Sequence, residues 1–164
     1  MTRDDNATDR TDRISDAATD RAERPHDIVV FGATGFVGGL VAKHLAAHAP
    51  TGTSIALVGR DRAKLSALRD DLPDTAADWP LIIADAASDA DMRALAESTR
   101  VVLTLVGPYA RYGHPLAHAC AAAGTDYVDL TGEVLFAHDS IAANHELAQS
   151  TGARIVHSCG FDSI

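Results

Sequence analysis

Three glycines spaced three residues apart carry the strongest chemical signal in the sequence. They lie between a short apolar run and a segment of helical periodicity, in the order Gly32, Ala33, Thr34, Gly35, Phe36, Val37 and Gly38. In a strand–turn–helix unit the first glycine permits the tight turn, the second admits a pyrophosphate, and the third allows close helix packing. We predict that residues 32–38 bind dinucleotide phosphates at the helix start. The alternative is a tight turn that binds nothing.

The residue after the second predicted strand indicates which dinucleotide is preferred. Sites for NAD usually place an acidic residue about 20 residues beyond the glycines, but this chain has Arg60 there, followed by Arg62 and Lys64. A guanidinium can bind a 2′-phosphate with two hydrogen bonds. We therefore predict NADP, with NADPH preferred over NADH, and assign Asp61 to a helix cap. The alternative for the basic residues is an ordinary solvated helix start.

Further polar and glycine residues follow the third and fourth predicted strands. Asp85 could accept a hydrogen bond from the adenine amino group, although an aspartate in such a loop is common. Gly107, Pro108 and Tyr109 follow the most apolar strand, so their backbone is expected to flank the nicotinamide ribose. Ligands of parallel α/β sheets bind beyond the carboxyl ends of the strands, and these four residues are therefore predicted to bind cofactor.

Three polar residues follow the fifth predicted strand and could lie near the transferred hydride. They are Asp129, Thr131 and Glu133. A role in stabilising the turn is an equally good interpretation for each of them. No catalytic residue is assigned.

The histidines do not form a recognisable metal site. His114 and His118 are four residues apart, and His145 begins a zinc-protease-like segment that has Gln149 where a second histidine is required. Without a third ligand at a suitable spacing, we predict no bound metal.

The two cysteines, Cys120 and Cys159, lie in apolar segments far apart in the chain. No signal peptide precedes them, so the expected environment is reduced and cytoplasmic. Cys159 has no base near it in sequence, and a buried structural thiol is the expectation.

Strand-like and helix-like segments alternate from residue 28 onward. Helix signals include Ser88 with Asp91 as a capping box, Pro115 near a helix start and Gly124 just past its end. This alternation predicts α/β architecture, a doubly wound parallel sheet of the Rossmann type. Strands are expected at 28–31, 55–58, 81–84, 101–106, 127–130 and 154–157, and helices around 37–45, 65–72, 88–95, 115–123 and 141–149.

Residues 1–27 differ from the remainder of the chain. They are rich in Thr, Asp, Arg and Ala, and Ile14 is the only large aliphatic residue after Met1. Such a segment buries too little apolar surface to offset the entropy of ordering it. We predict a disordered tail over 1–27 and a dinucleotide-binding domain over 28–164. An amphipathic targeting helix is a weaker alternative, because the aspartates are many and an apolar stripe is absent.

Length and charge limit the partners. The 164 residues suffice for one domain, and a net charge of −9 argues against nucleic acid or an anionic membrane surface. The uninterrupted apolar runs are too short to cross a bilayer, so no transmembrane segment is expected.

Several of these segments together resemble the NADP-binding domain of saccharopine-dehydrogenase-like oxidoreductases. Within that family the chain resembles the trans-acting enoyl reductase branch, for which the segment His-Ser-Cys-Gly-Phe-Asp-Ser-Ile is distinctive. The resemblance implies hydride transfer from NADPH, in some members to an enoyl group during complex-lipid synthesis. The matching stretches are 28–39, 57–65, 103–113, 124–133 and 157–164.

The same resemblance implies that part of the enzyme lies outside this chain. Family members continue into a substrate-binding and dimerising region, so we expect a fragment whose small-molecule substrate is bound mainly by a missing C-terminal region. A homodimer is the corresponding expectation for the full-length protein. The alternatives are a saccharopine-type amino-acid dehydrogenase domain and a cofactor-binding or sensing module without chemistry.

Overall fold

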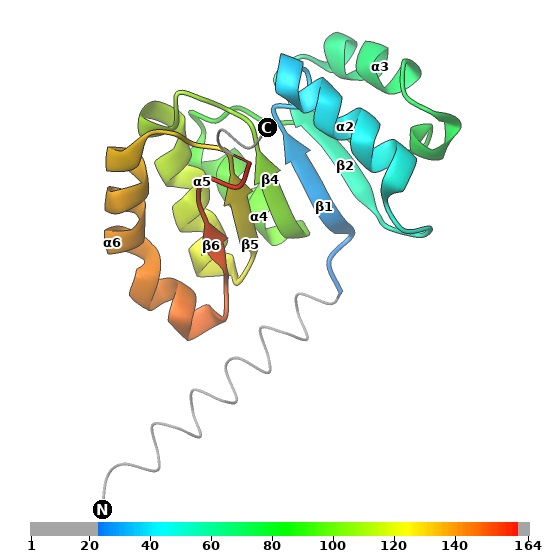
Figure 1. Ribbon diagram of the computed structural model, residues 1–164. Coiled ribbons are helices and arrows are strands. Elements are labelled where there is room, and N and C mark those ends of the chain that lie inside the picture. The colour runs from blue at the N-terminus through cyan, green and yellow to red at the C-terminus, as the bar shows by residue number, and fades with distance from the viewer. Residues whose placement is uncertain (1–22, 161–164) are drawn as a thin grey trace, which may run out of the picture.

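Six parallel strands form the sheet of the protein, whose computed structural model describes residues 23–160 (Figure 1). The order of strands across the sheet is β3-β2-β1-β4-β5-β6, which is the order of dinucleotide-binding doubly wound sheets. The predicted fold is confirmed. The strands are β1 (His26–Phe31), β2 (Ile55–Gly59), β3 (Leu81–Ile83), β4 (Thr99–Thr104), β5 (Asp126–Asp129) and β6 (Ile155–Val156).

Helices cover the sheet in two groups, visible on the two sides of Figure 1. Successive residues of a strand face opposite sides, so Val30 of β1 packs in one apolar cluster with Leu65, while the neighbouring Val29 packs in another with Met92 and Leu116. The helices are α2 (Phe36–His48), α3 (Arg62–Asp70), the short 3₁₀ helix η1 (Asp74–Ala76), α4 (Asp89–Glu97), α5 (Tyr109–Ala123) and α6 (Val134–Thr151).

Local capping explains where several helices begin and end. Asp61 Oδ1 accepts hydrogen bonds from the amides of Ala63 and Lys64 at 2.9 and 3.1 Å, and Ser88 Oγ accepts one from Asp91 N at 3.2 Å. Both predicted N-caps are thus confirmed. Gly124 ends α5 in the left-handed conformation, with φ of 70°, as its predicted place just past a helix requires.

Two predicted helix starts are wrong. Pro115 lies inside α5, not near its start, and α6 begins at Val134 instead of near residue 141. The first turn of α5 is stabilised from a distance, because the Glu133 carboxylate accepts hydrogen bonds from the amides of Tyr109 and Ala110. Such a partner does not show in local sequence.

Ordered structure begins a few residues before the expected boundary between tail and domain at residues 27 and 28. β1 begins at His26, and Asp27 accepts hydrogen bonds from Ser54 N and from the Arg100 guanidinium, each at 2.9 Å. Arg24 is held as well, since its guanidinium donates to Thr99 O at 2.8 Å. Residues 1–22, where the rest of the predicted tail falls, lie outside the described residues, as do residues 161–164.

Among residues 23–160, none of the helices combines the length and the apolar character needed to cross a membrane.

Candidate cofactor site

One pocket opens at the carboxyl ends of β1, β2, β3 and β4. It lies where the strand order reverses between β1 and β4, the usual ligand position in open α/β sheets. The turns after these strands line it, as the element order predicts. The lining residues are Phe31, Gly32, Thr34, Gly35, Gly59, Arg60, Asp85, Ala86, Leu105, Val106, Gly107 and Tyr112.

Two of the three glycines are required by the geometry of the turn after β1. Gly32 has φ of +87°, and a Cβ there would lie 3.0 Å from Val106 Cγ2. A Cβ on Gly38 would lie 2.2 Å from Gly32 O and 2.7 Å from Ala33 O. The predicted conformational roles of Gly32 in the turn and of Gly38 in close packing are therefore confirmed. Phosphate binding by this segment stays a prediction.

The start of α2 differs electrostatically from the starts of α3, α4 and α5. α2 has neither a side-chain cap nor an acidic residue in its first turn. By contrast, Asp61 caps α3, Ser88 caps α4, and the Glu133 carboxylate binds the first amides of α5. A helix start favours negative charge, so α2 offers its positive end to an anion from outside.

Arg60 is the member of the predicted basic trio that lines the pocket. Its side chain is exposed, and it follows directly after β2. Arg62 and Lys64 belong to the exposed first turn of α3 and are absent from the lining. The trio therefore divides into one pocket residue and two residues of an ordinary solvated helix start.

Asp85 lines the pocket after β3 and also stabilises its own loop. Its Oδ1 accepts a hydrogen bond from Ala87 N at 3.0 Å, and its amide donates to Asp91 Oδ2 at 2.9 Å. The side chain is exposed, so its second carboxylate oxygen can accept a bond from a ligand.

The other predicted residues lie beside the pocket. Ala33 is fully buried in the core, whereas Phe36 and Val37, at 86% and 41% exposure, stand at the start of α2. Pro108 follows a cis peptide bond after Gly107. None of these side chains lines the pocket.

Tyr109 is turned inward. Its side chain is buried, its hydroxyl donates to Thr104 O at 3.1 Å, and its ring packs on Phe136 at 5.7 Å between centroids. Burial raises the pKa of the Tyr109 hydroxyl to about 12. The residue is a fixed part of the core, and it does not place its hydroxyl in the pocket.

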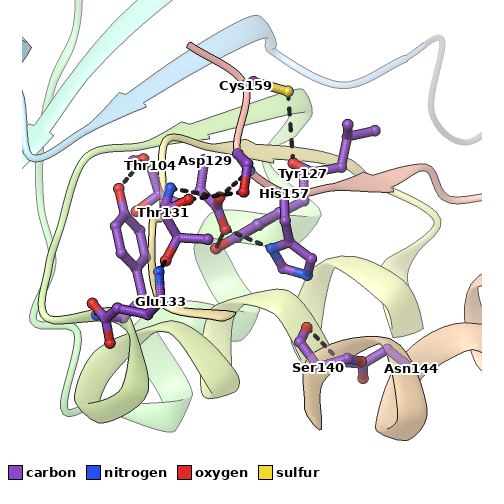
Figure 2. A network of polar contacts seen from close by, with 12 residues as sticks. Thr104, Tyr127, Asp129, Thr131, Glu133, Ser140, Asn144, His157 and Cys159 are labelled. Carbon is purple, nitrogen blue, oxygen red and sulfur yellow. Dashed lines mark hydrogen bonds and ion pairs between the residues drawn. The ribbon is translucent and has the colours of Figure 1, made fainter. Parts of the chain in front are cut away.

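Asp129 is the centre of a polar network at the ends of β5 and β6 (Figure 2). Its Oδ1 accepts hydrogen bonds from the amides of Thr131 and Ser158, both at 3.0 Å. Its Oδ2 accepts from the Tyr127 hydroxyl at 2.9 Å and from His157 Nδ1 at 2.7 Å. Burial alone would raise the pKa of Asp129, but these four donors outweigh it and hold the pKa below its ordinary value.

Glu133 continues the network to the loop after β4. Its Oε1 accepts from Tyr109 N at 2.7 Å and its Oε2 from Ala110 N at 2.8 Å, while its own amide donates to Thr131 Oγ1 at 3.0 Å. The carboxylates of Asp129 and Glu133 are thus both engaged within the protein. The geometry supports the turn-stabilising alternative for Asp129, Thr131 and Glu133.

The expectation for Cys159 is wrong. Cys159 is exposed beyond the end of β6, whereas Cys120 is buried. Ser158 and Gly160, both with positive φ, flank Cys159 and turn the chain away from the sheet. The apolar composition of the segment did not indicate this turn. Among residues 23–160, no cluster of three or more potential His, Cys, Asp or Glu ligands is present.

The family model described as the saccharopine dehydrogenase NADP binding domain matches residues 28–156. The chain belongs to this family. It is an NADP-binding domain, in agreement with the glycine turn and the order of its strands.

Several curated relatives of this NADP-binding domain are named trans-acting enoyl reductase. The chain is 56% identical over 143 residues to a trans-acting enoyl reductase of Mycobacterium tuberculosis and 54% identical to one of Mycobacterium ulcerans. In each case the match covers 87% of this chain and 34% of the relative. The chain therefore spans about a third of the length of the curated relatives it matches.

Solved structures show the same fold at low sequence identity. Saccharopine dehydrogenase (L-Glu forming) from Saccharomyces cerevisiae superposes with a TM-score of 0.62 at 20% identity, over 84% of this chain and 28% of that chain. Triphenylmethane reductase of Citrobacter sp., solved as its NADP(H) complex, gives 0.58 at 20% identity, over 80% and 48%. At this level of identity the likeness shows the fold of the NADP-binding domain.

Six lining residues of this NADP-binding domain were not predicted from the sequence, namely Phe31, Gly59, Ala86, Leu105, Val106 and Tyr112. Tyr112 has the largest side chain with a polar group among them. It lies half-buried in the first turns of α5, and the Arg111 guanidinium stands 4.9 Å from the centre of its ring. A signal was available, because Tyr112 belongs to the segment that follows the fourth strand, at the sheet edge where ligands of such folds bind.

Proposed function

We propose that this domain binds NADPH in the pocket at the β1–β4 reversal and serves an enoyl reductase. Gly32, Thr34, Gly35 and the first amides of α2 would hold the pyrophosphate, the last through the backbone of Phe36, Val37 and Gly38, with Ala33 shaping the turn. Asp85 would bind adenine. The backbone of Gly107, Pro108 and Tyr109 would flank the nicotinamide ribose. The observation that carries the proposal is the convergence of the glycine turn, the open α2 start and Arg60 on one pocket.

Arg60 carries the choice between NADPH and NADH in this proposal. It is the guanidinium that reaches the pocket from the strand next to β1, where the ribose of the adenosine half is bound in folds of this type. A charged, bidentate contact is worth a few kcal/mol, or one to two orders of magnitude in affinity.

Replacing Arg60 by alanine tests this assignment. Arg60→Ala should weaken NADPH binding by roughly 10- to 100-fold and change NADH binding little, measured by titrating the fluorescence of each dinucleotide. Arg62→Ala is the matched control, because it removes the same charge two residues away and outside the pocket. Equal losses for NADPH and NADH, or an equal effect of the two substitutions, would contradict the role of Arg60.

The reaction we infer is reduction of an activated carbon–carbon double bond in lipid metabolism. NADPH supplies the hydride, which would add to the β-carbon while a proton adds to the α-carbon, and the products would be the saturated acyl group and NADP⁺. The chain's residues would bind and orient the dinucleotide. Support comes from the shared name of relatives at 53% identity or more, while the solved saccharopine dehydrogenase is 20% identical to this chain. An amino-acid dehydrogenase is accordingly the second candidate.

The substrate would be held mainly outside these residues. Hydride transfer needs the acceptor carbon within about 3–3.5 Å of the nicotinamide and shielded from water, and the pocket is lined only by the ends of four strands, the loops after them and the start of α5. Val134 and Leu135, each 78% exposed at the start of α6, are apolar surface that a further region or a homodimer partner would cover. A reduced, cytoplasmic location belongs to the same proposal.

Residues 1–164 are therefore expected to bind NADPH without consuming it. The measurement is loss of NADPH absorbance with a panel of enoyl thioesters and keto acids, at concentrations where fluorescence shows the cofactor bound. Robust oxidation with an enoyl thioester would place the whole active site in this chain. Oxidation with a keto acid would favour the amino-acid dehydrogenase. Absence of NADPH binding would overturn the proposed function itself.

A further inference from the structure

We propose that Asp129 and His157 are positioning residues that hold the loops of the nicotinamide half of the site in place. The inference rests on the proposed function, because it assigns a role within the NADPH site. It concerns residues that are not among those lining the pocket.

Asp129 and His157 form a buried pair between neighbouring strand ends. Their side chains are 0% and 6% exposed, and His157 Nδ1 lies 2.7 Å from Asp129 Oδ2. Asp129 is held ionised by four donors, so its oxygens accept and the Nδ1 of His157 carries the hydrogen. Figure 2 shows the imidazole reaching from the end of β6 toward this carboxylate.

The other bonds of Asp129 fix two loops at the carboxyl edge. Its Oδ1 binds the amides of Thr131, after β5, and of Ser158, after β6. Ser158 has φ of 62°, a left-handed conformation that non-glycine residues adopt only when their surroundings impose it. The bond of Ser158 Oγ to Thr131 O at 2.8 Å ties the two loops to each other. The pair thus maintains a backbone geometry that the chain would not choose alone.

The network reaches the pocket through Glu133. Thr131 Oγ1 accepts the amide of Glu133, and the Glu133 carboxylate holds the amides of Tyr109 and Ala110. Gly107, two residues before Tyr109, lines the pocket. Displacing Asp129 therefore moves the loop after β4 through an unbroken series of hydrogen bonds.

This network belongs to one half of the site. Doubly wound sheets consist of two mononucleotide-binding halves, here β1–β3 and β4–β6. All the loops that Asp129, Thr131 and Glu133 join follow strands of the second half. Gly32, Arg60 and Asp85, which line the pocket on the adenosine side, are not members of the network. A defect at His157 should therefore weaken binding of the nicotinamide end and spare the adenosine end.

Only one nitrogen of His157 takes part. Its Nε2 is buried and has no hydrogen-bond partner among the described residues. The ring packs edge-on against Phe136 and Tyr127, with centroid distances of 5.1 and 5.7 Å. An asparagine can place its amide N–H near the position of Nδ1, whereas a glutamine extends to the position of Nε2. Asparagine should therefore substitute for His157, and glutamine should not.

The experiment compares NADPH with adenosine 2′,5′-bisphosphate, which carries only the adenosine end. Both are titrated against the wild type, His157→Asn, His157→Gln and His157→Leu, and thermal unfolding of each variant reports folding. We expect NADPH affinity to fall on the order of tenfold in His157→Leu and His157→Gln, with bisphosphate affinity unchanged. His157→Asn should retain NADPH affinity within about threefold of the wild type.

Other results would overturn the inference. Equal loss of both ligands in the leucine and glutamine variants would show a merely structural role, as would unchanged NADPH affinity in variants that fold. If the leucine variant does not fold, the comparison of the asparagine and glutamine variants tests the inference. These two side chains carry the same amide and differ only in length. A wild type that binds neither ligand would refute the proposed function instead. One that binds the bisphosphate as tightly as NADPH would show that no nicotinamide half contributes.

Discussion

Gly38 and Gly39 are adjacent glycines with different surroundings, and this difference shows how the turn after β1 is built. A Cβ at Gly38 would meet backbone oxygens 2.2 and 2.7 Å away, in atoms that cannot move without opening the turn. A Cβ at Gly39 would find only Leu68 Cδ1 at 3.8 Å, an ordinary contact. Both glycines lie in α2, so helix propensity affects them alike.

Alanine substitution should separate the two positions. Gly38→Ala is expected to destabilise the domain by about 3 kcal/mol or more, because the overlap involves backbone. Gly39→Ala should stabilise it by about 0.5–1 kcal/mol, since alanine reduces the entropy of the unfolded chain. Urea unfolding measures both. Similar effects at the two positions would mean that α2 does not approach the turn as closely as described.

The sequence predicted those residues whose roles depend on near neighbours. Asp61 and Ser88 cap helices through amides two or three residues away. Gly32 adopts the positive φ that the turn at its own position requires. The sequence could not predict Glu133 as the partner of Tyr109, 24 residues away, nor His157 as that of Asp129, 28 residues away. Such pairs arise only once the sheet order brings loop ends together.

At the scale of the elements, Arg24 joins the start of the domain to two helix ends. Its guanidinium donates to Thr99 O at 2.8 Å and to Ala96 O, in the last turn of α4, at 3.4 Å. It also donates to the carbonyl of Ala123, the last residue of α5. Carbonyls at helix ends favour a cation, so one side chain stabilises both α4 and α5.

Removing this side chain should cost more than removing an exposed arginine. Arg24→Ala is expected to lower stability by about 1–3 kcal/mol, because charge-assisted bonds to part-buried carbonyls are lost. Arg93→Ala is the control, because Arg93 is exposed and makes a single long contact of 3.5 Å to Asp89 O, and it should change stability by less than about 0.5 kcal/mol. Thermal unfolding compares them. If Arg24→Ala is as stable as the Arg93→Ala control, residues 23–27 do not contribute to the stability of the domain and belong to the predicted tail.

The position of a strand or helix could be predicted where the residues of that element alone determine it. β1, β2, β3, β5 and β6 overlap the predicted ranges closely, because short apolar runs mark them. The predicted range for β4, 101–106, lies two residues too far along the chain. The apolar run continues through residues 105 and 106, but the strand ends at Thr104. Leu105 and Val106 instead line the pocket and pack against the turn after β1.

At the scale of the whole molecule, the sheet is divided along the line between β1 and β4. Phe31 pairs with Thr104 there, although the two residues are roughly seventy positions apart in sequence. Closing a loop of that length costs about 4 kcal/mol in chain entropy on a simple polymer estimate, and both β2 and β3 lie within it. Pairing β1 with β4 therefore requires closing a long loop that contains two other strands of the sheet.

The pocket lies across this line between β1 and β4. Gly32 and Thr34 line it after β1, and Leu105 and Gly107 line it after β4. A dinucleotide bound there would touch both sides and act as a removable cross-link between distant parts of the chain. Its binding energy would add to the free energy of unfolding by mass action, by about 2.7 kcal/mol at a hundredfold excess over its dissociation constant. Cofactor supply would thus affect the fraction of the domain that is folded as well as its chemistry.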